Sequence, residues 1–296
     1  MQIEDYIKAG KIAAEVRELV RKKDWIGKTV YEICEEVEGE IKKRGAKCAF
    51  PVNASINEIA AHYTAEPNDP ITIKDTDLVK IDLGAQINGY IADTAVTVCY
   101  DVQFDGLVEA AEEALANAMS MIKTGVKVSD VGRTIEATIK QRGFKPIANL
   151  SGHSLEQYTI HAGRSIPNIW SIGGFSLSET AYACEPFVTT EQAGGFVRNG
   201  QIKNIFAINS RKKTKNEEAD KLLDFIWENF NMLPFALRWI TKKWDEKKAR
   251  ELLQILIKKK AVQAYPILIE INEQKVAQAE HTFIPNDNGV TITTKI

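Results

Sequence analysis

The chain of 296 residues contains an internal repeat that narrows the range of possible folds more than any other feature. The segment WIGKTVYEICEEVEGEIKKRGAK (25–47) aligns without a gap with KTGVKVSDVGRTIEATIKQRGFK (123–145), and eight of the 23 positions are identical. Apolar positions are also in register. Such self-similarity indicates two related halves. Chance likeness between two amphipathic helices that each end in glycine is the alternative.

Each half is predicted to be a pair of helices followed by strands. Residues 3–22 and 28–44 show helical periodicity, and Gly45 ends the second run. The strand candidates of the second half are residues 146–162, 181–189, 195–208, 266–285 and 290–295. The two sets of strands could form one sheet with helices on its outer face, which is an α+β fold. A functional site would then lie where the halves meet.

Residues 210–262 have a different character, with three short helical patterns interrupted by Pro234. We interpret this segment as an inserted helical subdomain, so that residues 1–209 and 263–296 form the main domain. Its aromatic residues are expected to form its own core rather than a cofactor site: Phe225, Trp227, Phe230, Phe235, Trp239 and Trp244.

Composition excludes several classes of protein. The residues are 44% hydrophobic and 26% charged, as in globular proteins, and a net charge of −2 gives no general attraction to nucleic acid or to anionic membranes. Acidic residues near the N-terminus argue against a signal peptide, so we expect a cytoplasmic protein. The four cysteines have no CxxC spacing and are expected to be reduced: Cys34, Cys48, Cys99 and Cys184.

The stretch VKIDLGAQINGYIADTAVTV (79–98) is predicted to be a β-hairpin with Asn88-Gly89 as a type I′ turn. This turn would pair Asp93 with Gly84 and place Asp82 on the same face as Asp93, diagonal to it. Two carboxylates so close could share a cation but would repel each other without one. Aspartate is depleted from strands, so the pair indicates a site.

Three of the four histidines are candidates for the same site. His153 and His161 are eight residues apart, so in a continuous strand they would point the same way. His62 and His161 follow Gly45 and Gly143 at nearly equal distances, which suggests a pair across the pseudo-symmetric centre. His281 is expected to be an ordinary core histidine.

Glu185 and Glu280 also occur in strand-like contexts. Buried carboxylates need a metal, a cation or a proton. Together with Asp82 and Asp93 they would offset the charge of two divalent ions, with His153 as a neutral imidazole ligand. Structural salt bridges could explain any one of the four.

The stretches DLGAQINGYIADTAVTV, GHSLEQYTIHAG, EPFVTT and AEHT resemble the metal-binding motifs of methionine aminopeptidases, in particular the short archaeal form of type 2. The resemblance extends to AFPVNASINEIAAHYT, LPFALRW and AYPIL, and so covers essentially the whole chain. It implies the pita-bread fold, two pseudo-symmetric halves with a curved, mainly antiparallel sheet. It also implies removal of the first methionine from peptides or nascent polypeptides whose second residue is small.

The resemblance further assigns roles to individual residues. It implies that two divalent metal ions, of Co, Mn, Fe or Zn, are bound by five residues: Asp82, Asp93, His153, Glu185 and Glu280. Glu185 would act as general base, and His62 and His161 would lie on the substrate side of the metals. Phe50, Ile160 and Tyr265 would surround the methionine side chain. We expect a monomer and leave contact with the ribosome open.

The sequence departs from the family at Glu156, where glycine is expected, so the strand carrying His153 could be reshaped. Two alternative functions also stay open. One is an X-Pro dipeptidase or aminopeptidase of the same fold, although such enzymes usually carry a separate N-terminal domain and lack the insertion at 210–262. The other is a non-catalytic protein of this fold that binds protein or RNA, although such relatives tend to lose ligands.

Overall fold

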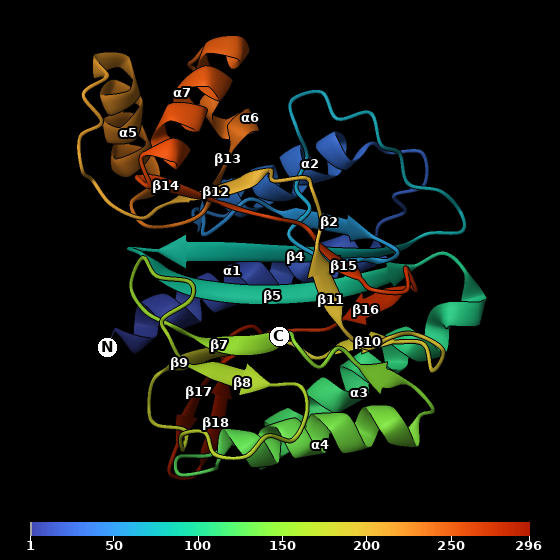
Figure 1. Ribbon diagram of the computed structural model, residues 1–296. Coiled ribbons are helices and arrows are strands. Elements are labelled where there is room, and N and C mark those ends of the chain that lie inside the picture. The colour runs from blue at the N-terminus through green and yellow to red at the C-terminus, as the bar shows by residue number, and fades with distance from the viewer. Residues whose placement is uncertain (1) are drawn as a thin grey trace.

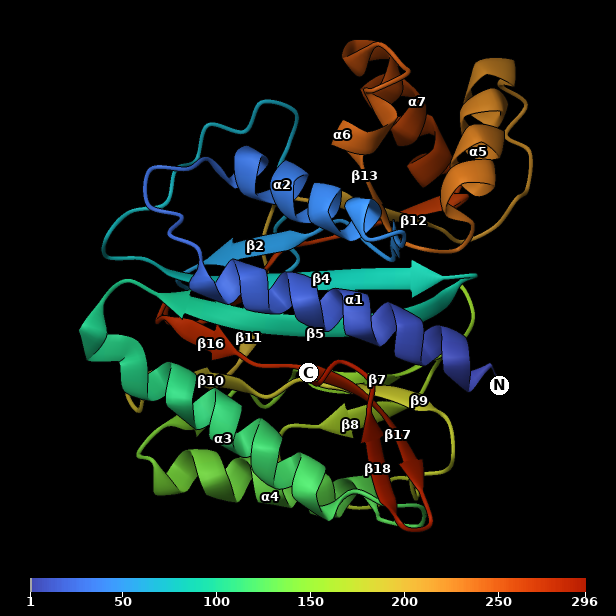
Figure 2. The same cartoon turned by 180° about the vertical axis from the view of Figure 1, so that it is seen from behind.

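The computed structural model describes residues 2–296, in which β-sheets form the middle of the molecule and helices cover one side of them (Figures 1 and 2). The helices are α1 Ile3–Lys22, α2 Val30–Lys43, the 3-10 turn η1 Val102–Phe104, α3 Asp105–Met121, α4 Val128–Gln141, α5 Glu217–Phe230, α6 Leu237–Ile240 and α7 Glu246–Lys258. No helix within residues 2–296 is long and apolar enough to cross a membrane.

The strands of the first half are β1 Lys47–Cys48, β2 Asn53–Ile56, β3 Ile59–Ala61, β4 Leu78–Ile87 and β5 Tyr90–Cys99. Those of the second half are β6 Lys145–Pro146, β7 Ser151–Leu155, β8 Ser165–Pro167, β9 Ala181–Cys184, β10 Phe187–Thr189, β11 Val197–Asn199, β12 Ile205–Ile208, β13 Phe235–Ala236, β14 Val262–Tyr265, β15 Leu268–Glu270, β16 Val276–Gln278, β17 His281–Asn286 and β18 Gly289–Ile292. Every strand pair is antiparallel.

The internal repeat is confirmed by the conformation of the two matched segments. Helices α2 and α4 are both 14 residues long. Before them, Gly27 and Gly125 have φ of 78° and 86°. Their N–H groups donate to the carbonyls of Ile73 and Leu177, each at 2.8 Å. Positive φ favours glycine, which explains why glycine occupies the same position in both copies of the repeat.

Each half buries its helices against the outer face of its own strands. Helices α1 and α2 cover β4 and β2 in the first half, and α3 and α4 cover the strands of the second half on the same side of the molecule, which faces the viewer in Figure 2. In the first half β4 is the central strand, paired with β1, β2 and β5. In the second half the order is β18-β17-β9-β7-β8. The helices thus leave the opposite face of the strands free for a site.

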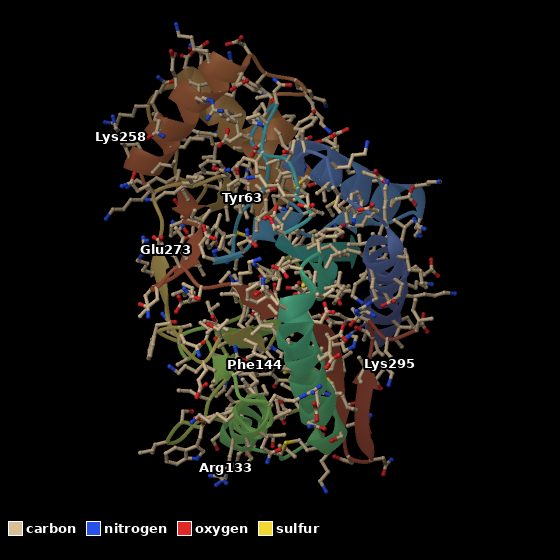
Figure 3. The ribbon with its side chains drawn as sticks, turned by 90° about the vertical axis from the view of Figure 1, so that its right-hand side faces the viewer. Tyr63, Arg133, Phe144, Lys258, Glu273 and Lys295 are labelled. Atoms are coloured by element: carbon tan, nitrogen blue, oxygen red, sulfur yellow. The ribbon has the colours of Figure 1, made fainter. Side chains whose placement is uncertain are left out.

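The helices α5, α6 and α7 gather at one end of the molecule, opposite α4 (Figures 1 and 3). Figure 3 shows this from the side, with Lys258 of α7 and Arg133 of α4 at the two ends. The helices pack around their own apolar core, to which all six aromatic residues named above contribute. A short sheet of β13, β12 and β14 lies at their base.

Several predicted strands are too long. The segment 146–162 contains β6 and β7 but ends its strand at Leu155, and 181–189 is interrupted at Glu185 and Pro186 between β9 and β10. The segments 195–208 and 266–285 are likewise divided into separate strands. Local apolar patterns do not reveal where a strand leaves one sheet and enters another, so these breaks are set by tertiary packing.

Candidate metal centre

The hairpin register predicted from the Asn88-Gly89 turn is confirmed. Strands β4 and β5 pair Gly84 with Asp93. Both turn residues have positive φ, 51° and 85°, as a type I′ turn requires. Asp82 lies opposite Ala95, two pairs farther along the ladder. Both aspartates line the same cavity. The register set by the turn therefore places them on one face, as predicted.

The structure places all the residues predicted for the site around that one cavity: Phe50, His62, Asp82, Asp93, His153, Ile160, His161, Glu185, Tyr265 and Glu280. They come from both halves. The aspartates lie on β4 and β5, His153 lies on β7, Glu185 lies between β9 and β10, and Glu280 lies between β16 and β17. The cavity therefore lies where the two halves meet.

The polar atoms at its floor converge without any Lys or Arg among them. One ligand atom from each of Asp93, His153 and Glu280 falls within 4.8 Å of the others. The Nε2 atom of His153 is 3.7 Å from Oδ2 of Asp93 and 3.6 Å from Oε1 of Glu185. The buried Oδ1 atoms of Asp82 and Asp93 have no hydrogen-bond partner among residues 2–296. A divalent cation would supply the missing partner.

Burial changes the protonation of these groups. It raises the pKa of Asp82 to about 7. The pKa values of Asp93, Glu185 and Glu280 rise well above their usual range, first because of burial and then because of neighbouring carboxylates. Burial, aided by His161, also lowers the pKa of His153 to about 3. The imidazole is therefore neutral, the form that binds metals.

His153 and His161 do meet, but the reason predicted for it is wrong. Strand β7 ends at Leu155, and a tight turn pairs Glu156 with Thr159 and reverses the chain. The two imidazole rings then lie with centroids 4.5 Å apart, edge to face. The turn, not the alternation of a long strand, brings His161 back over His153.

Glu156 itself has an ordinary backbone conformation. Its φ is not positive, and the residue of this turn with a left-handed φ is Tyr158, at 57°. Glu156 is exposed, and its N–H donates to the Thr159 carbonyl at 3.0 Å. Glycine is therefore not required at this position by backbone conformation.

His62 and His161 both lie close to the ring of Tyr265. The ring centroids are 5.8 Å apart for His62 and Tyr265, and 6.4 Å apart for His161 and Tyr265. Nδ1 of His62 is 3.3 Å from the Pro266 carbonyl, so Nδ1 carries the hydrogen and Nε2 keeps its lone pair. Burial lowers the pKa of His62 to about 4, which keeps this ring neutral.

Sequence reasoning missed two polar residues of the cavity region. Asn53 lies opposite Asp82 in the β2–β4 ladder and lines the cavity, where its buried Oδ1 has no partner. Nε2 of Gln278 is 3.4 Å from carboxylate oxygens of both Glu185 and Glu280. The position of Gln278, two residues before Glu280, could have revealed it, because alternate residues share a face.

His281 does not line this cavity; it is hydrogen-bonded but half-buried, not a fully buried core histidine. Its Nδ1 is 2.9 Å from Oγ1 of Thr294 and 3.1 Å from Nη1 of Arg17 on α1. The four cysteines are free thiols.

Comparison with known proteins identifies the family. The model of metallopeptidase family M24 matches residues 4–201. The chain is 43% identical to a methionine aminopeptidase of Methanocaldococcus jannaschii and 44% identical to one of Pyrococcus abyssi, with 100% of both chains covered in each case. Its fold is similar to the crystal structure of a methionine aminopeptidase from Thermotoga maritima, at 24% identity and a TM-score of 0.71, covering 100% of this chain and 97% of the other.

The pita-bread fold expected from the motifs is confirmed by this structural likeness. The family assignment has two grounds. Sequence identity exceeds 40% across whole chains, and the cavity gathers carboxylates and imidazoles from both halves. The chain belongs to metallopeptidase family M24 and, within it, to the methionine aminopeptidases.

Proposed function

We propose that this chain removes the N-terminal methionine from peptides and newly made proteins whose second residue is small, and that it works in the cytoplasm, where such chains are made. The observation that carries the proposal is the cluster of four carboxylates and a neutral imidazole in one partly apolar cavity, where Asp93 and Glu280 are 3% and 1% exposed. The cluster is complete within one chain, which supports action as a monomer.

The donor set fits divalent metal ions. Members of family M24 are metallopeptidases, and here four carboxylates share a buried site with no Lys or Arg to balance them. We infer that two ions are held by five residues: Asp82, Asp93, His153, Glu185 and Glu280. Two divalent charges would balance four carboxylates. Mixed carboxylate and imidazole ligands suit Co, Mn, Fe or Zn.

When bound, divalent ions supply an acidified water and polarise the scissile carbonyl. Glu185 would accept the proton of the attacking water at a carboxylate oxygen, because its Oε1 lies among the ligand atoms, 3.6 Å from Nε2 of His153. The ions would also attract the lone pair of the substrate's free α-amino group. That attraction restricts cleavage to the first residue.

The two substrate-side histidines would have different tasks. His161 is exposed at the cavity mouth and would donate a hydrogen bond to the oxygen that becomes negative in the tetrahedral intermediate. His62 donates from Nδ1 to Pro266, so its Nε2 would accept a hydrogen bond from the amide N–H of the scissile bond. This would hold the leaving amine in place.

The methionine side chain would contact Phe50, Ile160 and Tyr265. Phe50 is 4% exposed, and its ring lies against Gly84 between the two aspartates. A flexible thioether fits an irregular apolar wall of this kind.

Activity on Met-Ala-Ser, measured with the metal-reconstituted parent and with Glu185→Gln, tests the proposal. We expect the parent to release methionine and Glu185→Gln to lose at least about 100-fold in kcat. Faster hydrolysis of an X-Pro dipeptide would instead favour a prolidase-like enzyme. A parent that binds no divalent metal, or an Asp93→Ala variant as active as the parent, would favour a non-catalytic protein.

A further inference from the structure

The two halves meet along β5 and β16–β17, yet no main-chain ladder joins these strands within residues 2–296. Three threonine hydroxyl groups bridge them instead. Thr94 and Thr97 belong to β5 and Thr282 belongs to β17, and their exposed fractions are 0%, 5% and 0%. We call Thr94, Thr97 and Thr282 the threonine clasp.

Two members of the clasp each bond to both main-chain groups of one residue across the seam, Thr282 from β17 to β5 and Thr97 from β5 to β16. Oγ1 of Thr282 accepts from the N–H of Asp93 at 2.7 Å and donates to the Asp93 carbonyl at 2.8 Å. Oγ1 of Thr97 accepts from the N–H of Gln278 at 2.8 Å and donates to the Gln278 carbonyl at 2.7 Å. Both pairs fit one antiparallel register. A side-chain hydroxyl thus replaces direct main-chain pairing.

The hairpin register explains why Asp93 needs this contact. Ile87 and Tyr90 flank the two-residue turn and form a hydrogen-bonded pair, and pair types alternate along the ladder. Gly84 and Asp93 therefore form a non-hydrogen-bonded pair, which turns the N–H and carbonyl of Asp93 away from β4. Buried main-chain groups require partners, and Thr282 provides one for each.

The third member reaches a residue of the other half. Oγ1 of Thr94 donates to the Glu280 carbonyl at 2.7 Å. Thr94 is itself fixed by Arg17, whose Nη1 donates to Oγ1 at 2.8 Å. The hydroxyl of Thr282 therefore holds the main chain of Asp93, while the hydroxyl of Thr94 holds that of Glu280.

We propose that the threonine clasp sets the distance between the metal-binding carboxylates of the two halves, so that Thr94 and Thr282 are positioning residues of the metal centre. This rests on the ligand set proposed above. The clasp bonds to the main chain of Asp93 in one half and of Glu280 in the other, and the seam there has no ladder of its own. The halves are also joined by the β3–β15 ladder, but its paired residues do not include Asp93 or Glu280. Without the hydroxyl groups, β5 and β17 could therefore shift against each other, and the ligand atoms would separate.

Calorimetric titration of the metal-stripped protein with Mn²⁺ tests the proposal without measuring catalysis. Thr282→Val has nearly the same shape but lacks the hydroxyl, and we expect its Mn²⁺ affinity to fall by about 10- to 100-fold. Thr282→Ser keeps the hydroxyl and should bind as the parent does. Thr189→Val is the matched control, because Thr189 is 0% exposed and donates at 2.9 Å to the Lys275 carbonyl, away from the ligands.

The control separates positioning from general stability. The midpoint temperature of thermal unfolding should be lower in both valine variants than in the parent. Mn²⁺ affinity, in contrast, should fall in Thr282→Val and not in Thr189→Val. Equal affinity in Thr282→Val and the parent would refute the role of the clasp. If Thr282→Val does not fold, Thr94→Val takes its place with the same two outcomes; it loses the bond to the Glu280 carbonyl and the bond from Arg17, and Thr94→Ser keeps both.

Failure of the proposed ligand set gives a different result. Asp93→Ala should lose Mn²⁺ binding. If Asp93→Ala binds Mn²⁺ as tightly as the parent, the ligand set is wrong and the clasp has no metal centre to position. If Asp93→Ala loses the metal but Thr282→Val does not, the ligand set holds and the clasp proposal alone is overturned.

Discussion

Removal of the Glu38 carboxylate should destabilise the protein more than removal of a carboxylate at the surface. Glu38 on α2 and Arg238 on α6 are 1% and 2% exposed and form an ion pair. Nη1 of Arg238 donates to Oε2 of Glu38 at 2.8 Å, and Nε1 of Trp239 donates to the same oxygen at 2.6 Å. The N–H of Val52 donates to Oε1 at 3.1 Å. One carboxylate thus joins α2, the helical segment and the chain leading into β2.

The expected magnitude follows from this burial. Glu38→Ala leaves the buried Arg238 guanidinium with only the partly exposed Glu35 as counter-charge, 3.5 Å from its Nη1, and we expect a cost of about 3–5 kcal/mol. The orphaned donors of Val52 and Trp239 add to this, although such losses are not additive. In the double variant Glu38→Leu with Arg238→Met, no charge is left unpaired. It should therefore be more stable than Glu38→Ala.

Urea unfolding, followed by tryptophan fluorescence, measures these differences. Glu35→Ala is the matched control, because Glu35 also approaches Arg238 but its side chain is 29% exposed and pairs with Lys242 at the surface. We expect that control to lose no more than about 1 kcal/mol. If Glu38→Ala were no less stable than Glu35→Ala, or the double variant less stable than Glu38→Ala, the argument from burial would be wrong.

Three further predictions concern the cavity. A Cβ at Gly84 would lie 2.2 Å from Cε1 of Phe50, so Gly84→Ala should cost about 1–3 kcal/mol in urea unfolding and raise KM for Met-Ala-Ser. Gly39→Ala, with nothing within 4 Å of its Cβ, should not be destabilised, and equal loss in both would contradict this. His161→Ala should lower kcat about 10²-fold but leave Mn²⁺ affinity unchanged in calorimetry, and an unchanged kcat would exclude His161 as the donor. Addition of Mn²⁺ at about 100 times its Kd to the metal-stripped protein should raise the free energy of unfolding by about 2.7 kcal/mol. If the midpoint of thermal unfolding did not rise, the result would contradict a native metal site.

Local chemistry was enough to predict the hairpin and the first helices. Asn88-Gly89 fixes a two-residue turn, and that turn fixes the partner of Asp93. The predicted helix over residues 3–22 coincides with α1, Ile3–Lys22. Both features depend on interactions between residues close in sequence, which a single sequence contains in full.

The contact between His153 and His161 could not be derived correctly in this way. A continuous strand was expected, but a turn at residues 156–159 reverses the chain and brings the rings together. Likewise, no local pattern shows that Glu185 and Glu280 lie between strands rather than within them. Their places depend on which sheet each strand joins, and that is settled by packing between distant segments.

The sequence by itself predicted which residues gather around the cavity, because carboxylates and histidines in apolar, strand-like segments are costly unless they share a partner. It also determined the duplication, since matched glycines and apolar positions recur with one offset. Only the tertiary structure decided how the halves are joined. The seam between β5 and β17 depends on hydroxyl groups of Thr94 and Thr282 that meet main-chain atoms more than 180 residues away, and no local periodicity encodes such a distance.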